Sequence, residues 1–145
     1  MLTHIFQQSL DSGIVPIQWK HAYVSPVFKK GSTSDPKNYR PISLTSVVCK
    51  SMENIIVSQI MKHLKEHNIL SDSQFGFRSQ HSCESQLFVT INDIAKAMDE
   101  KLQVDAAVLD FSKAFDKVAH NRLLYKLDYY GIRGNLLTWL DSFLF

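Results

Sequence analysis

The stretch that most constrains the fold of this chain is residues 104–118, which read VDAAVLDFSKAFDKV. It holds a short, continuous apolar run, residues 106–109, followed at once by the carboxylate of Asp110. Short runs of small and β-branched apolar residues are typical of a strand that is buried on both faces. Ligand-binding side chains collect where such strands end. We therefore expect a buried strand that presents Asp110 at its carboxyl end.

Asp110 by itself is open to three interpretations. An acid at the end of a strand can act as a general base, cap the helix that follows, or bind a metal ion. Capping is a very common role for aspartate, so the physics of the residue alone favours it. A second acid, Asp116, lies in the same stretch and does not by itself decide between these roles.

Length and composition set the broad class. A chain of 145 residues with 45% hydrophobic residues is long enough for one globular domain with its own core. No apolar run approaches the ~20 residues that span a bilayer, and the N-terminus lacks a secretory signal pattern. We expect an intracellular protein, in the nucleus or the cytoplasm, that does not bind membranes. Cys49 and Cys83 lack CxxC spacing, which favours reduced thiols over zinc ligands.

Periodicity and turn signals predict the other elements. Apolar residues at helical spacing predict helices over residues 2–12, from Ser46 to Asn68, from Ser82 onward, after Asp116 and from Asn135 onward. Residues 22–28 and 39–44 resemble strands, and the turn sequence GSTSDPKN lies between them. Pro26 restricts the first of these strands to an edge or an irregular segment. The sequence thus predicts a β-hairpin.

The predicted hairpin is basic and aromatic. Between residues 20 and 50 the single acid is Asp35, whereas the basic residues are Lys20, Lys29, Lys30, Lys37, Arg40 and Lys50. Four aromatic residues are interleaved with them: Trp19, Tyr23, Phe28 and Tyr39. Cations suit a phosphate backbone and aromatic rings suit unstacked bases, so nucleic acid is an expected partner. A solvated loop with snorkelling lysines explains the composition equally well.

One short pattern suggests a different chemistry. His63, Glu66 and His67 match H-x-x-E-H, an order found in some zinc proteases. A catalytic zinc site needs three protein ligands, and the sequence does not indicate a third. We expect these histidines to interact with the C-terminal end of their helix instead. The nucleophile elbow and the phosphate-binding glycine patterns are absent from the sequence, which removes support for those reaction classes.

Four stretches together resemble the reverse transcriptase of non-LTR, LINE-type retrotransposons. They are WKHAYVSPVFKKGS (19–32), DPKNYRPISLTSVVCKSMENII (35–56), LSDSQFGFRSQHS (70–82) and VLDFSKAFDKVAHNRLLYKL (108–127). They follow the family's order and approximate spacing over nearly the whole chain. The resemblance implies an α+β fold, the fingers and first part of the palm of a right-hand polymerase. Residues 1–100 would then be fingers-like, with the basic hairpin at 20–50, and residues 101–145 would begin the palm.

The resemblance also implies site residues. Asp110 would be the first catalytic aspartate and, with the backbone carbonyl of Phe111, would bind Mg²⁺ or Mn²⁺, of which the complete domain holds two ions. Phe115 would lie under the sugar of the incoming nucleotide and exclude a 2′-hydroxyl. Arg40 and Lys29, with Lys30 as the alternative lysine, would contact the nucleotide phosphates.

Further roles follow from the QFGFR block. Gln74 and Arg78 would lie near the template, although Phe75 and Phe77 can simply pack. Asp116 belongs to the family's pattern without being one of its usual metal ligands, and would have a structural or orienting role.

The chain departs from the family in one respect. The family continues into a hairpin with a Tyr-x-Asp-Asp pair, which is not in this sequence. We therefore expect a partial RNA-directed DNA polymerase domain, truncated before the catalytic Asp-Asp hairpin and inactive alone. Its expected partners are an RNA template, a DNA primer and deoxynucleoside triphosphates. The alternatives are a non-catalytic nucleic-acid-binding or interaction module, and the remnant of a decayed retroelement.

Overall fold

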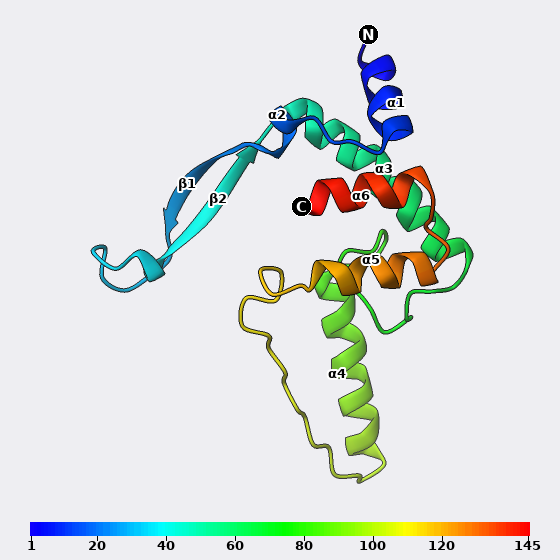
Figure 1. The fold of residues 1–145 in the computed structure, drawn as a ribbon. Coiled ribbons are helices and arrows are strands. Elements are labelled where there is room, and N and C mark those ends of the chain that lie inside the picture. The colour runs from blue at the N-terminus through cyan, green and yellow to red at the C-terminus, as the bar shows by residue number, and fades with distance from the viewer. The chain divides into compact units, whose positions relative to one another are not determined.

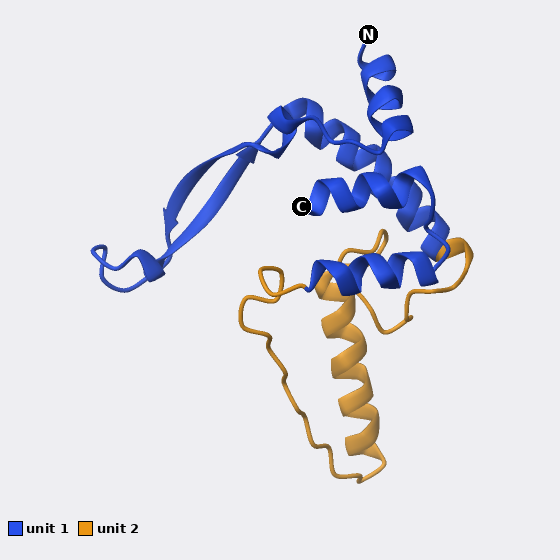
Figure 2. Cartoon of the chain, viewed as in Figure 1, with its two compact units in different colours: residues 1–64, 119–145 blue, residues 65–118 orange.

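The computed structural model describes residues 1–145, which form two compact units. Residues 1–64 and 119–145 make up the first unit, and residues 65–118 the second (Figure 2). The helices and strands are, in chain order, α1 (Leu2–Ser12), α2 (Ile17–Lys20), β1 (Ala22–Phe28), the 3₁₀ helix η1 (Pro36–Asn38), β2 (Tyr39–Thr45), α3 (Val47–Glu66), α4 (Cys83–Asp99), α5 (His120–Tyr129) and α6 (Asn135–Leu144) (Figure 1). This mixture of helices with one small sheet is compatible with the expected α+β class.

The helix ends follow from local chemistry. Gly13 ends α1 in the left-handed conformation, with φ at 66°, and its N–H donates to helix carbonyls. Ser82 caps α4 through a capping box with Ser85. Two hydrogen bonds lower the pKa of Glu84 in the first turn of α4. The larger effect comes from the Ser82 side chain, and the smaller from the backbone amide of Glu84 itself. At the start of α3, the Ser46 hydroxyl lies 3.5 Å from the Cys49 amide nitrogen. The predicted helices are confirmed.

The predicted hairpin is also confirmed, and its two strands form the whole sheet. β1 and β2 pair antiparallel with Pro26 directly opposite Pro41. The Lys29 amide donates to the Asn38 carbonyl oxygen at 2.8 Å, so Lys29 and Asn38 form a hydrogen-bonded pair. From this pair toward the base of the hairpin, hydrogen-bonded and non-hydrogen-bonded pairs alternate. The two prolines therefore occupy a non-hydrogen-bonded pair, where an N–H would point outward from the hairpin. Each proline removes an outward donor from one open edge without costing the hairpin a bond.

The core of the first unit joins both ends of the chain. Its buried members are Val15, Trp19, Cys49, Met52, Ile56 and Trp139. Helix α6 contributes Trp139, which is 1% exposed and stacks on Phe143 with ring centroids 5.4 Å apart. The Trp139 indole N–H donates to the buried Ser9 hydroxyl of α1. A polar pair at the centre of this core thus fixes α1 against α6.

The expectation of a buried strand at residues 104–109 is wrong. These residues have no regular secondary structure and are exposed, with Val108 at 92% and Leu109 at 85%. A strand exists only when a neighbour supplies the ladder hydrogen bonds, and β1 and β2 pair only with each other. The apolar run therefore lacks both a hydrogen-bonding partner and a covering layer. In the same unit, α4 also has no buried residue.

Candidate nucleotide and nucleic-acid site

The register of the hairpin sorts its cations by face. Val27 pairs with Arg40, and side chains alternate between the two faces along each strand. Lys29, two residues after Val27 and bonded through its amide to Asn38, therefore lies on the same face as Arg40. Lys30 follows the last residue of the extended pairing and lies in the bend at the tip. The hairpin thus places Lys29 and Arg40 on one face, close to the tip.

The tip is held in shape by bonds that do not involve the charged groups of its lysine and arginine side chains. The Asp35 carboxylate accepts from the Lys37 amide at 2.9 Å and caps η1. The Asn38 side chain donates to the Ser32 carbonyl oxygen at 2.9 Å, and the Tyr39 hydroxyl donates to the Thr33 carbonyl oxygen at 2.8 Å. The chain's ion pairs at Arg78 and Arg133 lie elsewhere. The cationic heads of the hairpin are therefore available to an external anion.

The aromatic residues around the hairpin have different roles. Trp19 is not available to a partner, because it is 9% exposed and meets Phe6 edge to face in the core. Phe28 and Tyr39 occupy the two facing positions nearest the tip, and their rings meet edge to face with centroids 5.5 Å apart. Tyr23 is 85% exposed. Of the interleaved aromatics, Tyr23 is therefore the one whose ring faces are open.

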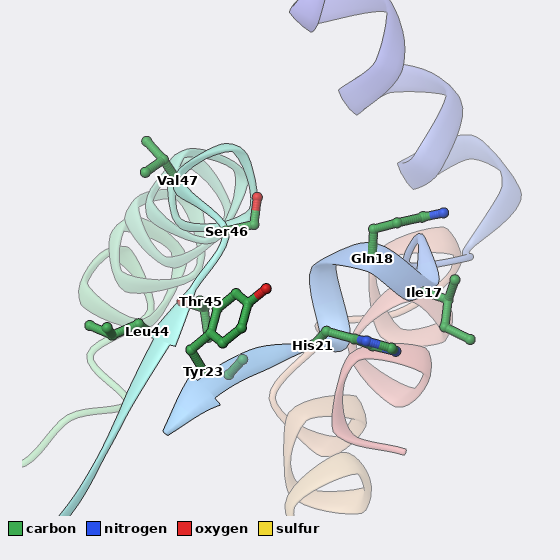
Figure 3. A pocket seen from close by; sticks show the side chains of 9 residues that line it. Ile17, Gln18, His21, Tyr23, Leu44, Thr45, Ser46 and Val47 are labelled. Carbon is green, nitrogen blue, oxygen red and sulfur yellow. The ribbon is translucent and has the colours of Figure 1, made fainter. Parts of the chain in front are cut away.

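An open cavity of about 860 Å³ lies at the base of the hairpin. It is formed where α2, the first residues of β1, the last of β2 and the start of α3 come together (Figure 3). The lining residues are Ile17, Gln18, His21, Ala22, Tyr23, Leu44, Thr45, Ser46 and Val47. The walls are mainly apolar, with a few polar groups among them. The sequence did not single out this cavity, and the hairpin register is needed to place Tyr23 on the face of Arg40.

The residues of the 104–118 stretch lie in the second unit. Asp110 and Phe111 are both exposed, in a segment without regular structure. Phe115 is 77% exposed, and its ring meets that of Phe77 edge to face with centroids 5.9 Å apart. Phe77 has a left-handed backbone, with φ at 60°, which is unusual for a bulky residue. The structure therefore connects the QFGFR block to Phe115, a contact that sequence spacing does not indicate.

Gln74 and Arg78 make bonds within their own loop. The Gln74 side chain donates to the Gly76 carbonyl oxygen at 3.1 Å. The Arg78 guanidinium donates to the Ser71 carbonyl oxygen at 2.7 Å and lies 4.0 Å from the Asp72 carboxylate. Its side chain is 16% exposed. In this structure the Arg78 side chain therefore bridges back to the start of its own loop.

The donor set for a metal ion is incomplete. Nowhere in the chain do three or more His, Cys, Asp or Glu side chains gather where they could hold an ion. A carboxylate beside a backbone carbonyl, as at Asp110 and Phe111, has the oxygen chemistry that Mg²⁺ prefers but supplies only part of its coordination. The chain by itself therefore does not provide a two-metal centre.

The zinc pattern has a structural interpretation at His63. Its Nε2 lies 2.7 Å from the Tyr130 carbonyl oxygen, at the end of α5. The ring also faces Gly131, where a side chain would come within 3.5 Å of it. His63 thus joins α3 to the end of α5 inside the first unit.

Comparison with known proteins decides the family. A sequence profile described as reverse transcriptase (RNA-dependent DNA polymerase) matches residues 27–145, which include both the hairpin tip and Asp110. The chain belongs to the reverse transcriptase family. None of the helices in this member of the reverse transcriptase family is long and apolar enough to cross a membrane.

Its relatives are proteins of mobile elements. The chain is 36% identical to a probable RNA-directed DNA polymerase from transposon BS of Drosophila melanogaster, over 94% of the chain and 16% of that protein. It is 38% identical to the RNA-directed DNA polymerase from mobile element jockey of the same species, over 86% of the chain and 14% of that protein. A Pol polyprotein from type-1 retrotransposable element R2 of Popillia japonica is 24% identical over 87% of the chain. The resemblance to non-LTR retrotransposon reverse transcriptases is confirmed, and the chain spans about a sixth of these relatives.

Proposed function

We propose that this chain forms the nucleotide-binding and template-binding part of an RNA-directed DNA polymerase of a non-LTR retroelement. Its substrates would be deoxynucleoside triphosphates, a DNA primer and an RNA template. The observation that carries the proposal is the placement of Lys29 and Arg40 on one face of an exposed hairpin, without an acidic partner in the chain. Family membership supports the same reaction class.

In this proposal the hairpin binds the triphosphate. Arg40 would hold phosphate oxygens by bidentate donation, and a lysine would add a point charge. The register favours Lys29 over Lys30 for that lysine, because Lys29 shares the face of Arg40. Lys30 lies in the bend, where its side chain is free to follow the strand of nucleic acid.

Asp110 would bind a divalent ion, Mg²⁺ or Mn²⁺, together with the Phe111 carbonyl. The ion would stabilise negative charge on the reacting phosphate oxygens. Because this chain supplies only one carboxylate at that place, we expect it to depend on further carboxylates of a longer polymerase. Phe115 would form the wall beneath the sugar, with Phe77 supporting its ring from the side.

A primer-extension assay tests the proposal. The chain alone, with primed RNA template, deoxynucleotides and Mg²⁺, is expected to give no extension. The same residues within a longer polymerase should give extension that Asp110→Ala abolishes and that Arg40→Ala weakens by raising KM for the nucleotide. Arg122→Ala, an exposed arginine of α5, is the control that removes the same charge outside the hairpin. Templated synthesis by the isolated chain that requires Asp110 would contradict the expected inactivity.

A non-catalytic nucleic-acid-binding module is the second candidate, and the unpaired cations of the hairpin favour it. This function predicts salt-dependent RNA binding that Asp110→Ala leaves unchanged and that Arg40→Ala weakens. Binding that is absent, or that does not respond to salt, would count against it.

A further inference from the structure

We propose that the cavity at the base of the hairpin holds an unstacked base of single-stranded RNA against the ring of Tyr23. This inference rests on the proposed function, which makes RNA a partner of the chain. The site that it adds is separate from the residues proposed to bind the nucleotide.

The first argument is the continuity of one hairpin face. Tyr23 pairs with Leu44 at the base, and Val27 pairs with Arg40 nearer the tip. Residues four apart on a strand lie on the same face, roughly 13 Å from each other at the usual rise. Tyr23 in the cavity, Arg40 and Lys29 therefore form a single line along the hairpin. In the absence of a nucleotide, a strand of RNA whose phosphates meet the two cations would pass the mouth of the cavity.

The second argument is the chemistry of the cavity. Tyr23 offers an exposed ring that stacks on no other aromatic residue of the chain. The lining residues, labelled in Figure 3, include the apolar Ile17, Leu44 and Val47. They also include Gln18, His21 and Ser46, which carry hydrogen-bonding groups. Unstacked RNA bases are bound by aromatic stacking combined with hydrogen bonds to their edges. The lining has both kinds of group.

The third argument is what the hairpin excludes. A peptide that docked as an added strand would need outward backbone donors, and Pro26 and Pro41 remove one from each edge at the same level. An apolar partner would not need the two cations that share this face. The strands themselves carry no acid, and Asp35 at the tip is occupied in capping η1. Charge therefore favours a polyanion.

Fluorescence anisotropy with labelled oligouridylate and the full 145-residue chain tests the site. Tyr23→Ala is expected to weaken binding by about tenfold, because it removes one stacking contact. Tyr23→Phe should bind as the wild type does, since it keeps the ring. Tyr125→Ala, which removes an exposed tyrosine from α5, is the matched control and should have no effect.

Salt dependence separates stacking from charge. Tyr23→Ala should leave the slope of log affinity against log salt unchanged, whereas Arg40→Ala should reduce it by about 0.7. An abasic oligomer of the same length should bind the wild type about tenfold more weakly than oligouridylate, and should not distinguish Tyr23→Ala from the wild type.

Two results would overturn the inference. One is equal binding of abasic and intact RNA by the wild type, a comparison that stands even if Tyr23→Ala fails to fold. The other is a Tyr23→Ala chain that folds, as judged by circular dichroism, and binds like Tyr125→Ala. If Arg40→Ala still weakens binding in either case, the proposed function stands and only the base site is lost. A chain that binds no RNA at low salt would overturn both.

Discussion

The indole Nε1 of Trp139 donates a hydrogen bond to the hydroxyl oxygen of Ser9 at 3.0 Å, across 130 residues of sequence. The same Ser9 hydroxyl donates to the Ile14 carbonyl oxygen at 2.6 Å. Ser9 and Trp139 are both buried, so water does not readily replace the bond between them. The family profile matches residues 27–145. The core of the first unit therefore also includes residues that lie before the match, and the bond between Ser9 and Trp139 links them to α6.

Ser9→Ala should lower the free energy of unfolding by about 1–3 kcal/mol, because it leaves the buried indole N–H of Trp139 without its partner. Denaturant unfolding monitored by tryptophan fluorescence measures the loss. Ser58→Ala is the control, since Ser58 is an exposed helical serine bonded only to the Ile55 carbonyl of its own turn. Equal stability of the two variants would show that the Ser9–Trp139 bond does not stabilise the fold.

Gly13→Ala should destabilise the chain by about 1–3 kcal/mol. The residue has a positive φ of 66°, and an added Cβ would lie 2.7 Å from Cγ2 of Thr138. Thermal unfolding followed by circular dichroism gives the shift in Tm. Gly76→Ala provides the comparison, because nothing lies within 4 Å of a Cβ at that position. A Gly13→Ala chain as stable as Gly76→Ala would contradict the close approach of α1 to α6.

Cys49 should react with thiol reagents only after unfolding. Burial raises the pKa of its thiol to about 12, and the hydrogen bond to Glu53 and the charge of that carboxylate act in the same direction. In the native chain at pH 8, a colorimetric thiol assay should therefore detect Cys83 alone, and both cysteines in denaturant. Rapid modification of two thiols in the native chain would show that Cys49 is accessible.

The same thiol predicts a pH dependence of stability. The unfolded thiol loses its proton near pH 9.0, whereas the folded one keeps it to about pH 12. The folded state then binds more protons in that window, so the stabilisation present below pH 9 falls as pH rises through it. Cys49→Ala should remove this component, seen as a shallower decline of the unfolding free energy with pH. An unchanged slope would contradict the raised pKa.

Replacing both prolines of the hairpin, Pro26→Val with Pro41→Val, should promote self-association. Each substitution restores an outward N–H on an open edge and adds a β-branched side chain. Light scattering across a concentration series measures the effect. Ser25→Val is the control, because Ser25 occupies a hydrogen-bonded pair with Ile42 and gains no outward donor. If the control associates as strongly as the double variant, hydrophobicity rather than the open edge drives the process.

Local signals in the sequence were enough to predict the five longer helices and the hairpin, whereas the short helices α2 and η1 were not predicted. Glycine at the end of α1, serine at the starts of α3 and α4, and the turn sequence of the hairpin act within a few residues of themselves. Such signals depend on backbone geometry and short hydrogen bonds, which the neighbouring sequence specifies. The four family-like stretches were likewise visible in the sequence, so the family could be inferred before the structure.

Burial and partnership were decided by the tertiary structure. Trp19 lies next to basic residues in the sequence, yet it is buried in the core that α1, α3 and α6 form. Tyr23, four residues later, is exposed. The hairpin register places Tyr23, Arg40 and Lys29 on one face, which spacing alone does not establish. Residues 104–109 have strand composition but no strand, because ladder bonds and a covering layer must come from distant segments. The sequence by itself thus determined the five longer helices, the hairpin and the family, whereas pairing between distant residues decided which side chains are available to a ligand.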